Sequence, residues 1–254
     1  MKVSFVYLDI SFDPIYWYHS RKFIGTYQAF PAGTEHELVI ALVGADNEAM
    51  KAARQREFEP VASRFVYEPK EGWDLTHHKN IARGLDSDFA VFCTSRTYFW
   101  RQGWLAKLVE ARKQKGEGIY GTVGSYEFYP HLRTMFFGCR PGALANYGYD
   151  CDDNPSAVRF EAGENNITRS FDGKAYMVTW DGIYEQAQWR SPANIFRRGD
   201  QSNMLAWDKH SDLYTFANAT QRKWMENLAD GVYHPKHGKL LGKLRNKFDR
   251  YLRR

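Results

Sequence analysis

The first 124 residues alternate between short apolar runs and longer amphipathic stretches, and this alternation leaves few possible fold classes. Runs rich in β-branched and aromatic residues predict strands at 2–8, 37–43, 64–67, 89–93 and 119–123. The stretches between them predict helices at about 14–27, 47–58, 75–85 and 104–115. Strands that alternate with helices of this length are typical of a parallel sheet. The sequence therefore predicts a Rossmann-like α/β fold with a mostly parallel central sheet flanked by helices.

Residues with strong capping preferences mark the starts of several of these helices. Pro14 follows Asp13 at the start of the first helix, and Asn47 precedes the second. Asp74 is predicted to cap the third helix. Beyond residue 124 the alternation becomes irregular. There the sequence predicts strands at 135–139 and 175–179, and helices at 163–171, 201–208 and 218–228.

Polar residues follow several of the predicted strands. Right-handed crossovers place the carboxyl ends of parallel strands along one edge of a sheet. This edge would collect Asp9, the turn at 44–46, the loop after Tyr67 and the polar segment Thr94-Ser95-Arg96. Open α/β sheets bind their ligands beyond the carboxyl ends of the strands. We therefore expect the binding site at this edge.

The positive charge of the chain is concentrated at its C-terminal end. The whole chain carries a formal net charge of +5. Residues 234–254 contain eight Lys or Arg and one Asp, so this segment carries +7 and the rest of the chain −2. A nucleic-acid groove needs cations spread over the body of the fold, so nucleic acid is not an expected partner.

The C-terminal segment also has the pattern of an amphipathic helix. Its apolar residues fall on one helical stripe, surrounded by Lys and Arg. The stripe consists of Leu240, Leu241, Leu244, Phe248, Tyr251 and Leu252. Such a helix either docks on the body through this stripe or lies on an anionic membrane surface. Binding of RNA by the tail is a third alternative.

Several familiar chemistries have no support in the sequence. Cys93, Cys139 and Cys151 are widely spaced and form no CxxC pair, which indicates reduced thiols rather than a zinc site or disulfides. Neither a dinucleotide-binding glycine motif nor a phosphate-binding loop is present, and the hydrolase elbow is missing as well. The N-terminus reads as a strand rather than a signal peptide. We expect a cytoplasmic protein, associated with the inner face of the membrane through its tail.

Four segments, taken in order, resemble the GT-A glycosyltransferases, in particular their family 2-like bacterial branch. They are HHKNIARGL at 77–85, the stretch 86–108 with its Gly-Trp-Leu, the acidic segment 160–178, and IFRRGDQSNMLAWDKH at 195–210. The resemblance implies a GT-A domain over 1–230. Residues 1–124 would form its nucleotide-sugar-binding half and 125–230 its acceptor half, and 231–254 would form a basic amphipathic tail.

The resemblance implies an inverting transfer of a sugar from a nucleotide-sugar donor to a glycan or lipid-linked acceptor, in cell-surface polysaccharide synthesis. One departure concerns the metal-binding Asp-x-Asp motif, whose two aspartates correspond to Thr94 and Arg96. A carboxylate pair binds Mg²⁺ or Mn²⁺, and Thr-Ser-Arg does not bind a hard cation in this way. A guanidinium can instead pair with phosphate oxygens. We therefore expect metal-independent transfer with no required cofactor, and the alternative is an inactive family member in which Arg96 is a surface residue.

The transfer needs a carboxylate that takes the proton of the acceptor hydroxyl. The resemblance places this base at 161–166, where Glu161 or Glu164 would serve because the family's usual second acid is Asn165. Asp200 is a third candidate. Two of these residues have structural alternatives: Glu161 as a helix-cap partner, and Asp200 as the cap of the following helix.

The resemblance also implies the remaining contacts. The donor would be held by Tyr7, Asp9, Lys79, Asn80, Thr94, Ser95 and Arg96. The acceptor or the diphosphate would be held by His131, Arg133, Thr134, Gln201, Asn203, Lys236 and His237. A structural role for His131 is the alternative at that position.

Two other classes of function remain open at this point. The first is a non-catalytic nucleotide- or sugar-binding module on the same fold, which the missing Asp-x-Asp motivates. The second is a membrane- or RNA-binding protein whose tail determines its binding.

Overall fold

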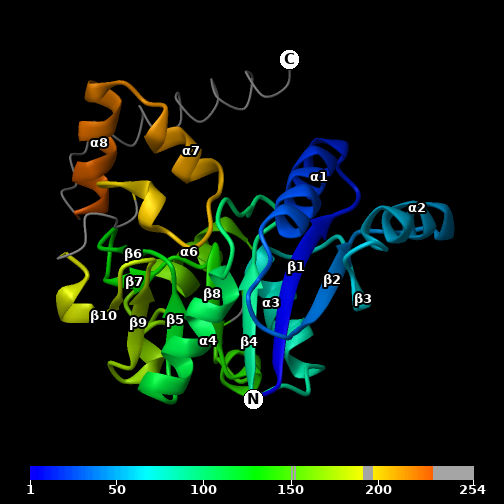
Figure 1. The fold of residues 1–254 in the computed structure, drawn as a ribbon, viewed down its shortest axis with the longest axis horizontal. Coiled ribbons are helices and arrows are strands. Elements are labelled where there is room, and N and C mark those ends of the chain that lie inside the picture. The colour runs from blue at the N-terminus through cyan, green and yellow to red at the C-terminus, as the bar shows by residue number, and fades with distance from the viewer. Residues whose placement is uncertain (150, 152, 191–196, 231–254) are drawn as a thin grey trace.

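A mixed sheet lies at the centre of the protein (Figure 1). The computed structural model describes residues 1–149, 151, 153–190 and 197–230. Within these residues eight strands form the sheet, in the order β10-β9-β5-β8-β4-β1-β2-β3. Their bounds are β1 (Val3–Ile10), β2 (Glu37–Val43), β3 (Arg64–Glu68), β4 (Phe89–Cys93), β5 (Ile119–Gly121), β8 (Phe136–Cys139), β9 (Ala175–Val178) and β10 (Ile183–Glu185). A separate pair consists of β6 (Gly124–Ser125) and β7 (His131–Leu132).

The sheet is mostly parallel. Strands β3, β2, β1 and β4 run in one direction, and β9 runs parallel to β5. Strand β8 is antiparallel to both β4 and β5, and β10 is antiparallel to β9. The predicted α/β class, with a mostly parallel central sheet flanked by helices, is confirmed. The reversed strand β8 matters for the site, because its first residues lie where the parallel strands end.

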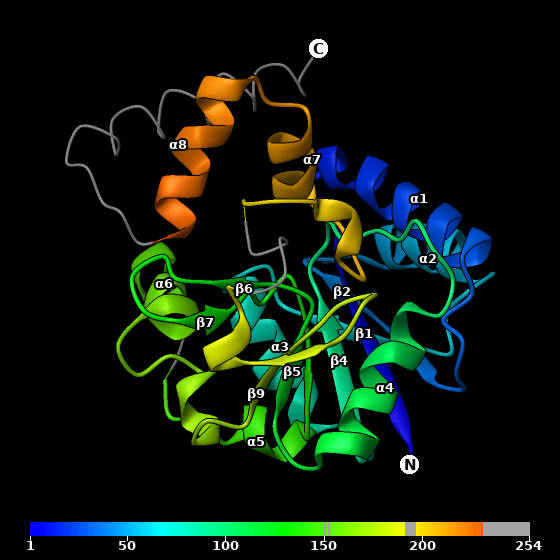
Figure 2. The same cartoon turned by 60° about the vertical axis from the view of Figure 1, so that its left-hand side comes forward.

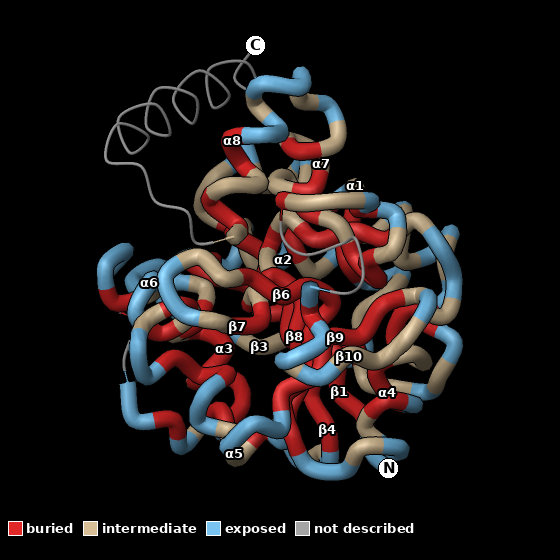
Figure 3. Tube along the Cα trace, turned by 90° about the vertical axis from the view of Figure 1, so that its left-hand side faces the viewer, coloured by how far each residue is buried: buried red, intermediate tan, exposed pale blue. Residues whose placement is uncertain are grey.

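Helices cover both faces of the sheet, and alternate side chains of β1 show the division. Phe5 and Tyr7 belong to one hydrophobic cluster, and Val6 and Leu8 belong to another. The first cluster includes residues of α1 (Pro14–Ala29), α2 (Glu48–Phe58) and α4 (Trp104–Lys115). The second includes residues of α3 (Asp74–Arg83), α5 (Pro141–Ala145) and α6 (Asn154–Ala162). Figure 3 shows the strands as buried segments between exposed outer turns.

Two further helices, α7 (Lys209–Thr215) and α8 (Ala219–Ala229), lie beyond the edge at which β1 ends (Figures 1 and 2). They share a small apolar cluster of their own, with Tyr214, Trp224, Met225 and Leu228 buried. They therefore stand over the predicted binding edge as a helical pair.

The structure corrects two predicted helices. The prediction of a helix at 163–171 is wrong, because the chain forms its helix earlier, as α6. Its start is set by Asp153, which shares a capping box with Ser156, and it ends at Gly163 in an extended conformation. Residues Arg169–Phe171 form only a 3-10 turn.

The helix predicted at 201–208 is also wrong. Only Gln201–Asn203 forms a 3-10 turn, and the chain then becomes extended. It pairs antiparallel at two isolated bridges, Thr179 with Met204 and Tyr98 with Trp207. Pairing with distant segments has therefore outweighed the local helical pattern.

The C-terminal predictions fall outside the described residues, including Lys236, His237 and the amphipathic tail. Among the described residues, no helix combines the length and the apolar character that crossing a membrane requires.

The centre of the sheet provides a test of its packing. A Cβ added to Gly138 of β8 would lie 2.5 Å from Phe89 Cζ and 2.9 Å from Val91 Cγ2, both in the core. We expect Gly138→Ala to lower the free energy of unfolding by about 1–2 kcal/mol through overpacking. Gly142→Ala is the matched control, because nothing lies within 4 Å of its added Cβ. Urea unfolding of both variants measures the difference, and equal stabilities would contradict the packing.

Candidate functional site

The candidate site lies at the edge of the sheet where β1, β2 and β4 end and β8 begins (Figure 1). Cys93 at the end of β4 pairs with Phe136 at the start of β8. The loop after β4 is tied to the segment before β8. The Thr94 amide donates to the Met135 carbonyl over 3.2 Å, and Thr97 Oγ1 donates to the same oxygen over 3.0 Å. Two predicted groups of site residues, 94–96 and 131–134, are thereby brought to one edge.

Glu161 is held at this edge by residues that precede β8. Its Oε1 accepts hydrogen bonds from the Thr134 amide over 2.8 Å and from Thr134 Oγ1 over 2.7 Å. Its Oε2 pairs with Arg133 Nη1 over 2.8 Å. Glu161 lies in the last turn of α6, so the structure joins a predicted catalytic acid to two predicted acceptor or diphosphate residues.

The surroundings of Glu161 favour its ionised form. Burial acts to raise the pKa of its carboxyl, but Arg133, His131 and the hydrogen bonds from Thr134 outweigh burial. The net result is a lowered pKa. A carboxylate with a low pKa is a weak proton acceptor, so this geometry suits a positioning role better than that of a base.

Arg96 is half-buried in the loop after β4 and is fixed by one aromatic residue. Its Nη2 donates to the Tyr16 hydroxyl over 2.6 Å, and its guanidinium carbon lies 4.7 Å from the centroid of that ring. Burial, followed by the charge of Arg96, lowers the pKa of His19 to about 4. The positive charge of Arg96 therefore acts on the neighbouring side chain of His19.

Helix α7 adds two more groups. Asp208 caps its first turn, because Oδ1 accepts from the His210 amide over 2.8 Å and from the Ser211 amide over 3.1 Å. This cap fixes Lys209 and His210 at the start of the helix. Burial, then Arg197 and other cations, lower the pKa of His210 well below its ordinary value.

These groups act on one another electrostatically, and we call them the edge cluster. The edge cluster consists of Asp74, Arg96, Arg133, Glu161, Lys209 and His210. Its three cations, Arg96, Arg133 and Lys209, come from three separate segments of the chain. They outnumber its two carboxylates, Asp74 and Glu161. An anionic group such as a diphosphate matches this arrangement, since guanidinium groups can pair bidentately with phosphate oxygens.

Two predicted donor-binding residues have strong structural roles. Tyr7 is buried, stacks on Phe23 with ring centroids 3.8 Å apart, and donates its hydroxyl to the Ser95 carbonyl over 2.8 Å. Asp9 is fully buried beneath Arg54, whose Nε and Nη2 pair with its two oxygens over 2.9 and 2.6 Å. Their contact with a nucleotide stays a prediction.

The other predicted donor residues lie on α3 and in the loop after β4. Lys79 is buried and donates to the Tyr149 carbonyl over 2.7 Å. Asn80 donates to Glu68 Oε2 over 3.1 Å. Thr94 Oγ1 lies 3.3 Å from Thr97 Oγ1. All three have interactions within the protein that hold them in place.

The remaining predicted acids and acceptor residues are dispersed. Glu164 is exposed, next to the α6 end. Asp200 caps the 3-10 turn through Ser202, which confirms its structural alternative. Gln201 is buried and donates to the Arg198 carbonyl over 2.9 Å, and Asn203 accepts from the Asp181 amide over 3.2 Å. A catalytic role for Glu164 or Asp200 stays a prediction.

His131 is fully buried, and its surroundings favour the neutral ring. Nδ1 lies 2.7 Å from the Tyr129 carbonyl, and Nε2 has no hydrogen-bond partner among the residues that the structure describes. Burial is the largest influence on its pKa and lowers it, against the opposing charge of Glu161. These contacts support the structural alternative for this residue.

The donor set at the Asp-x-Asp position does not fit a divalent cation. It offers the hydroxyl of Thr94, the buried Ser95 and the cationic Arg96. Across 1–149, 151, 153–190 and 197–230, no group of three or more His, Cys, Asp or Glu side chains is placed to hold a metal. Metal independence stays a prediction.

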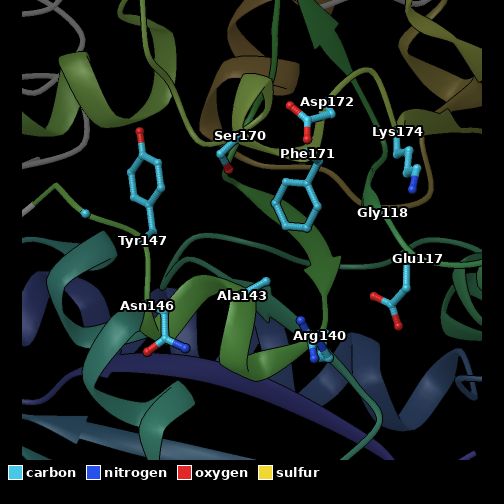
Figure 4. Close-up of a pocket in the computed structure, with 11 residues that line it drawn as sticks. Glu117, Gly118, Arg140, Ala143, Asn146, Tyr147, Ser170, Phe171, Asp172 and Lys174 are labelled. Atoms are coloured by element: carbon cyan, nitrogen blue, oxygen red, sulfur yellow. The ribbon is translucent and has the colours of Figure 1, made fainter.

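A hollow opens at the opposite edge of the sheet (Figure 4). It has a volume of about 590 Å³ and is lined by residues that include Arg140, Lys174, Glu117 and Asp172. Both signs of charge face it, so it lacks the cationic excess of the edge cluster. Because α/β sheets bind ligands beyond the carboxyl ends of their strands, we place the site at the edge cluster.

Sequence reasoning missed Asp74, Lys209 and His210 as site residues. Asp74 was expected to cap α3, and the helix predicted at 201–208 concealed the start of α7. The pattern Asp208-Lys-His-Ser211 is an N-terminal capping signature that could have located this helix.

Comparisons with known proteins show a distant likeness of fold. No protein-family model and no curated protein matches the sequence. Among solved structures, mouse xyloside xylosyltransferase 1 is 6% identical with a TM-score of 0.40, over 58% of this chain and 69% of that one. S. aureus TarS 1–349 in complex with UDP-GlcNAc is 11% identical with a TM-score of 0.41, over 59% of this chain and 48% of that one. HddC from Yersinia pseudotuberculosis is 10% identical with a TM-score of 0.40, over 59% and 81%. At these TM-scores the likeness is limited to the general arrangement of strands and helices.

Proposed function

We propose that this protein is a glycosyltransferase that moves a sugar from a nucleotide-sugar donor to a glycan or lipid-linked acceptor. The observation that carries this proposal is the edge cluster, in which Arg96, Arg133 and Lys209 all act electrostatically on His210 beyond the carboxyl ends of parallel strands. A diphosphate placed there would meet cations from three elements. The cluster thus offers the positive charge that other enzymes obtain from a metal ion.

Arg96 is the residue best suited to the leaving group. When the bond between the anomeric carbon and the diphosphate breaks, negative charge develops on the phosphate oxygen. The Arg96 guanidinium is already oriented by Tyr16, so little further ordering is needed as this charge appears. We assign Glu161 to holding Arg133 and Thr134 in position, and we propose inversion and metal independence for the transfer.

The acceptor side is proposed from the charge of the chain. Residues 234–254 carry +7 and an apolar stripe, which suits an anionic membrane surface and a lipid-linked acceptor. We propose that the enzyme acts at the inner face of the membrane in cell-surface polysaccharide synthesis.

One observation favours a second candidate, a non-catalytic module that binds a nucleotide or a sugar. Two of the predicted catalytic acids are engaged structurally: Glu161 by Arg133 and Thr134, and Asp200 as a cap. A protein of this kind would bind the donor and leave it intact.

Binding of nucleoside diphosphates tests the proposed role of Arg96. We expect Arg96→Ala to weaken binding of UDP or GDP about 10- to 100-fold, because the substitution removes a hydrogen-bonded charge pair between the guanidinium and the diphosphate. Calorimetric titration of the full chain in EDTA measures the affinity. The control is Arg140→Ala, an exposed arginine at the opposite edge. Unchanged affinity in Arg96→Ala would remove this residue from the site.

Turnover separates the two candidates. Transfer or hydrolysis of UDP- or GDP-hexoses that persists in EDTA supports a metal-independent enzyme. Turnover that appears only with added Mn²⁺ contradicts metal independence. Tight binding of UDP or GDP with no turnover of these donors favours the non-catalytic module.

A further inference from the structure

Asp74 begins α3 but does not cap it. The cap position is occupied by Trp73, and no side chain makes a cap hydrogen bond there. Throughout the described part of the chain, the carboxylate of Asp74 has no hydrogen-bond or ion-pair partner. The side chain is half-buried, so it remains reachable from solvent at the carboxyl edge of the sheet. An acid in the first turn interacts favourably with the helix dipole, but no specific partner among the described residues fixes this carboxylate.

Three other buried or half-buried acids at this edge are already engaged. Asp9 pairs with Arg54 through both oxygens, and Glu161 is held by Arg133 and Thr134. Asp208 caps α7.

Two more acids are engaged close by. Glu68 Oε2 lies 3.1 Å from His77 Nδ1 and accepts from Asn80 over 3.1 Å. Glu127 pairs with Arg197 over 3.6 Å. Asp74 is thus distinguished by an uncommitted carboxylate within the edge cluster.

The charged groups that act on Asp74 come from several elements. Arg96 follows β4, Lys209 starts α7, and Glu161 ends α6. His77 lies on α3 itself. The charge of Asp74 also acts on Cys93 at the end of β4. Asp74 therefore lies within electrostatic reach of the guanidinium that we assign to the departing diphosphate.

The pKa of Asp74 is better suited to a general base than the pKa of Glu161. Burial raises the pKa of Asp74 above its ordinary value, and the attraction of Arg96 opposes this only in part. The pKa of Glu161 is instead lowered. Proton transfer is most efficient when the pKa of the base approaches the working pH.

We infer that Asp74 is the general base of the proposed transfer, an inference that rests on the proposed function. The acceptor oxygen forms a bond to the anomeric carbon while its proton passes to the Asp74 carboxylate. The bond between the anomeric carbon and the phosphate oxygen breaks, and its electron pair leaves with the nucleoside diphosphate beside Arg96. Asp74 then releases the proton to water.

The test compares Asp74→Asn with the wild-type full-length chain. Hydrolysis of UDP- and GDP-hexoses, with water as the acceptor, measures turnover, and calorimetry with UDP and GDP measures binding. We expect turnover to fall about 10²- to 10⁴-fold, the usual contribution of a general base. Affinity for UDP and GDP should not fall, because the substitution removes a negative charge from the edge cluster, and the urea midpoint should stay close to the wild-type value. The matched control is Asp172→Asn, an exposed acid at the opposite edge, which should leave turnover unchanged.

The pH profile distinguishes a base from a structural residue. Wild-type turnover should fall as the pH decreases and Asp74 takes up a proton, and this acidic limb should be missing in Asp74→Asn. Normal turnover in Asp74→Asn, or loss of turnover only together with binding or stability, would overturn the inference alone. A wild-type protein that binds UDP or GDP and turns over no donor would overturn the enzymatic proposal, and the inference with it.

Discussion

Asp9→Ala is expected to lower the free energy of unfolding by about 3–5 kcal/mol, because it leaves a buried guanidinium without its main partner. Arg54 is almost fully buried, and its Nε and Nη2 both bond to Asp9, with Nη1 paired to Glu57. Ser11 and Ser20 also donate to the Asp9 carboxylate, over 2.7 and 2.6 Å. A loss of this size is a large fraction of the 5–15 kcal/mol that holds a typical domain together.

Urea unfolding at neutral pH measures this effect, with two controls. Arg21→Ala removes an exposed pair with Glu57 and should cost at most about 1 kcal/mol. The double variant Asp9→Leu with Arg54→Met removes both buried charges and should recover much of the loss. If Asp9→Ala were as mild as Arg21→Ala, Asp9 would not be a structural anchor. The predicted role of Asp9 in contacting the nucleotide would then be favoured.

Glu161→Ala is expected to cost about 3 kcal/mol at pH 7, because it removes the carboxylate that pairs with Arg133 Nη1 and accepts two hydrogen bonds from Thr134. The effect depends on pH in a defined direction. The pKa of Glu161 is lower in the folded protein than in the unfolded chain. Its stabilisation is therefore complete above the ordinary glutamate pKa of about 4.3 and disappears as the pH falls through the lowered value.

Unfolding free energies of the wild type and of Glu161→Ala, measured at several pH values from 7 downwards, test this prediction. The difference between the two proteins should shrink in acid. Glu164→Ala is the matched control, since its side chain is exposed and should change stability by less than about 0.5 kcal/mol. A difference that stays constant down to strongly acidic pH would contradict the ionised pairing of Glu161.

Local signals account for how well the first half of the fold was predicted. Strand 89–93 and helix 104–115 have the predicted bounds, and Asn47 caps α2 as expected. Each of these elements carries its own periodicity and its own end signals within a short stretch of chain. The second half depends on distant pairing. Residues 204–207 are extended because Met204 and Trp207 bridge to Thr179 and Tyr98.

Some parts of the candidate site were likewise predictable from the sequence, and others were not. The alternation of strands and helices predicted the edge, and the family resemblance drew attention to Arg96, Arg133 and Glu161. Their neighbours were not predictable. Whether Glu161 meets Arg133 depends on how α6 packs against the start of β8, and Lys209 reaches the edge only because α7 stands above it.

The sequence alone determined the α/β class and the edge at which polar residues gather, because periodicity and chain crossovers are properties of the local pattern. Only the tertiary structure decided which acids are engaged. Asp9 in β1 is covered by Arg54 of α2, Glu161 is held by Arg133 and Thr134, and Asp74 has no hydrogen-bond or ion-pair partner among the described residues. The charge state and the chemical use of a carboxylate depend on burial and on partners far away in the chain, and these are set when the elements pack together.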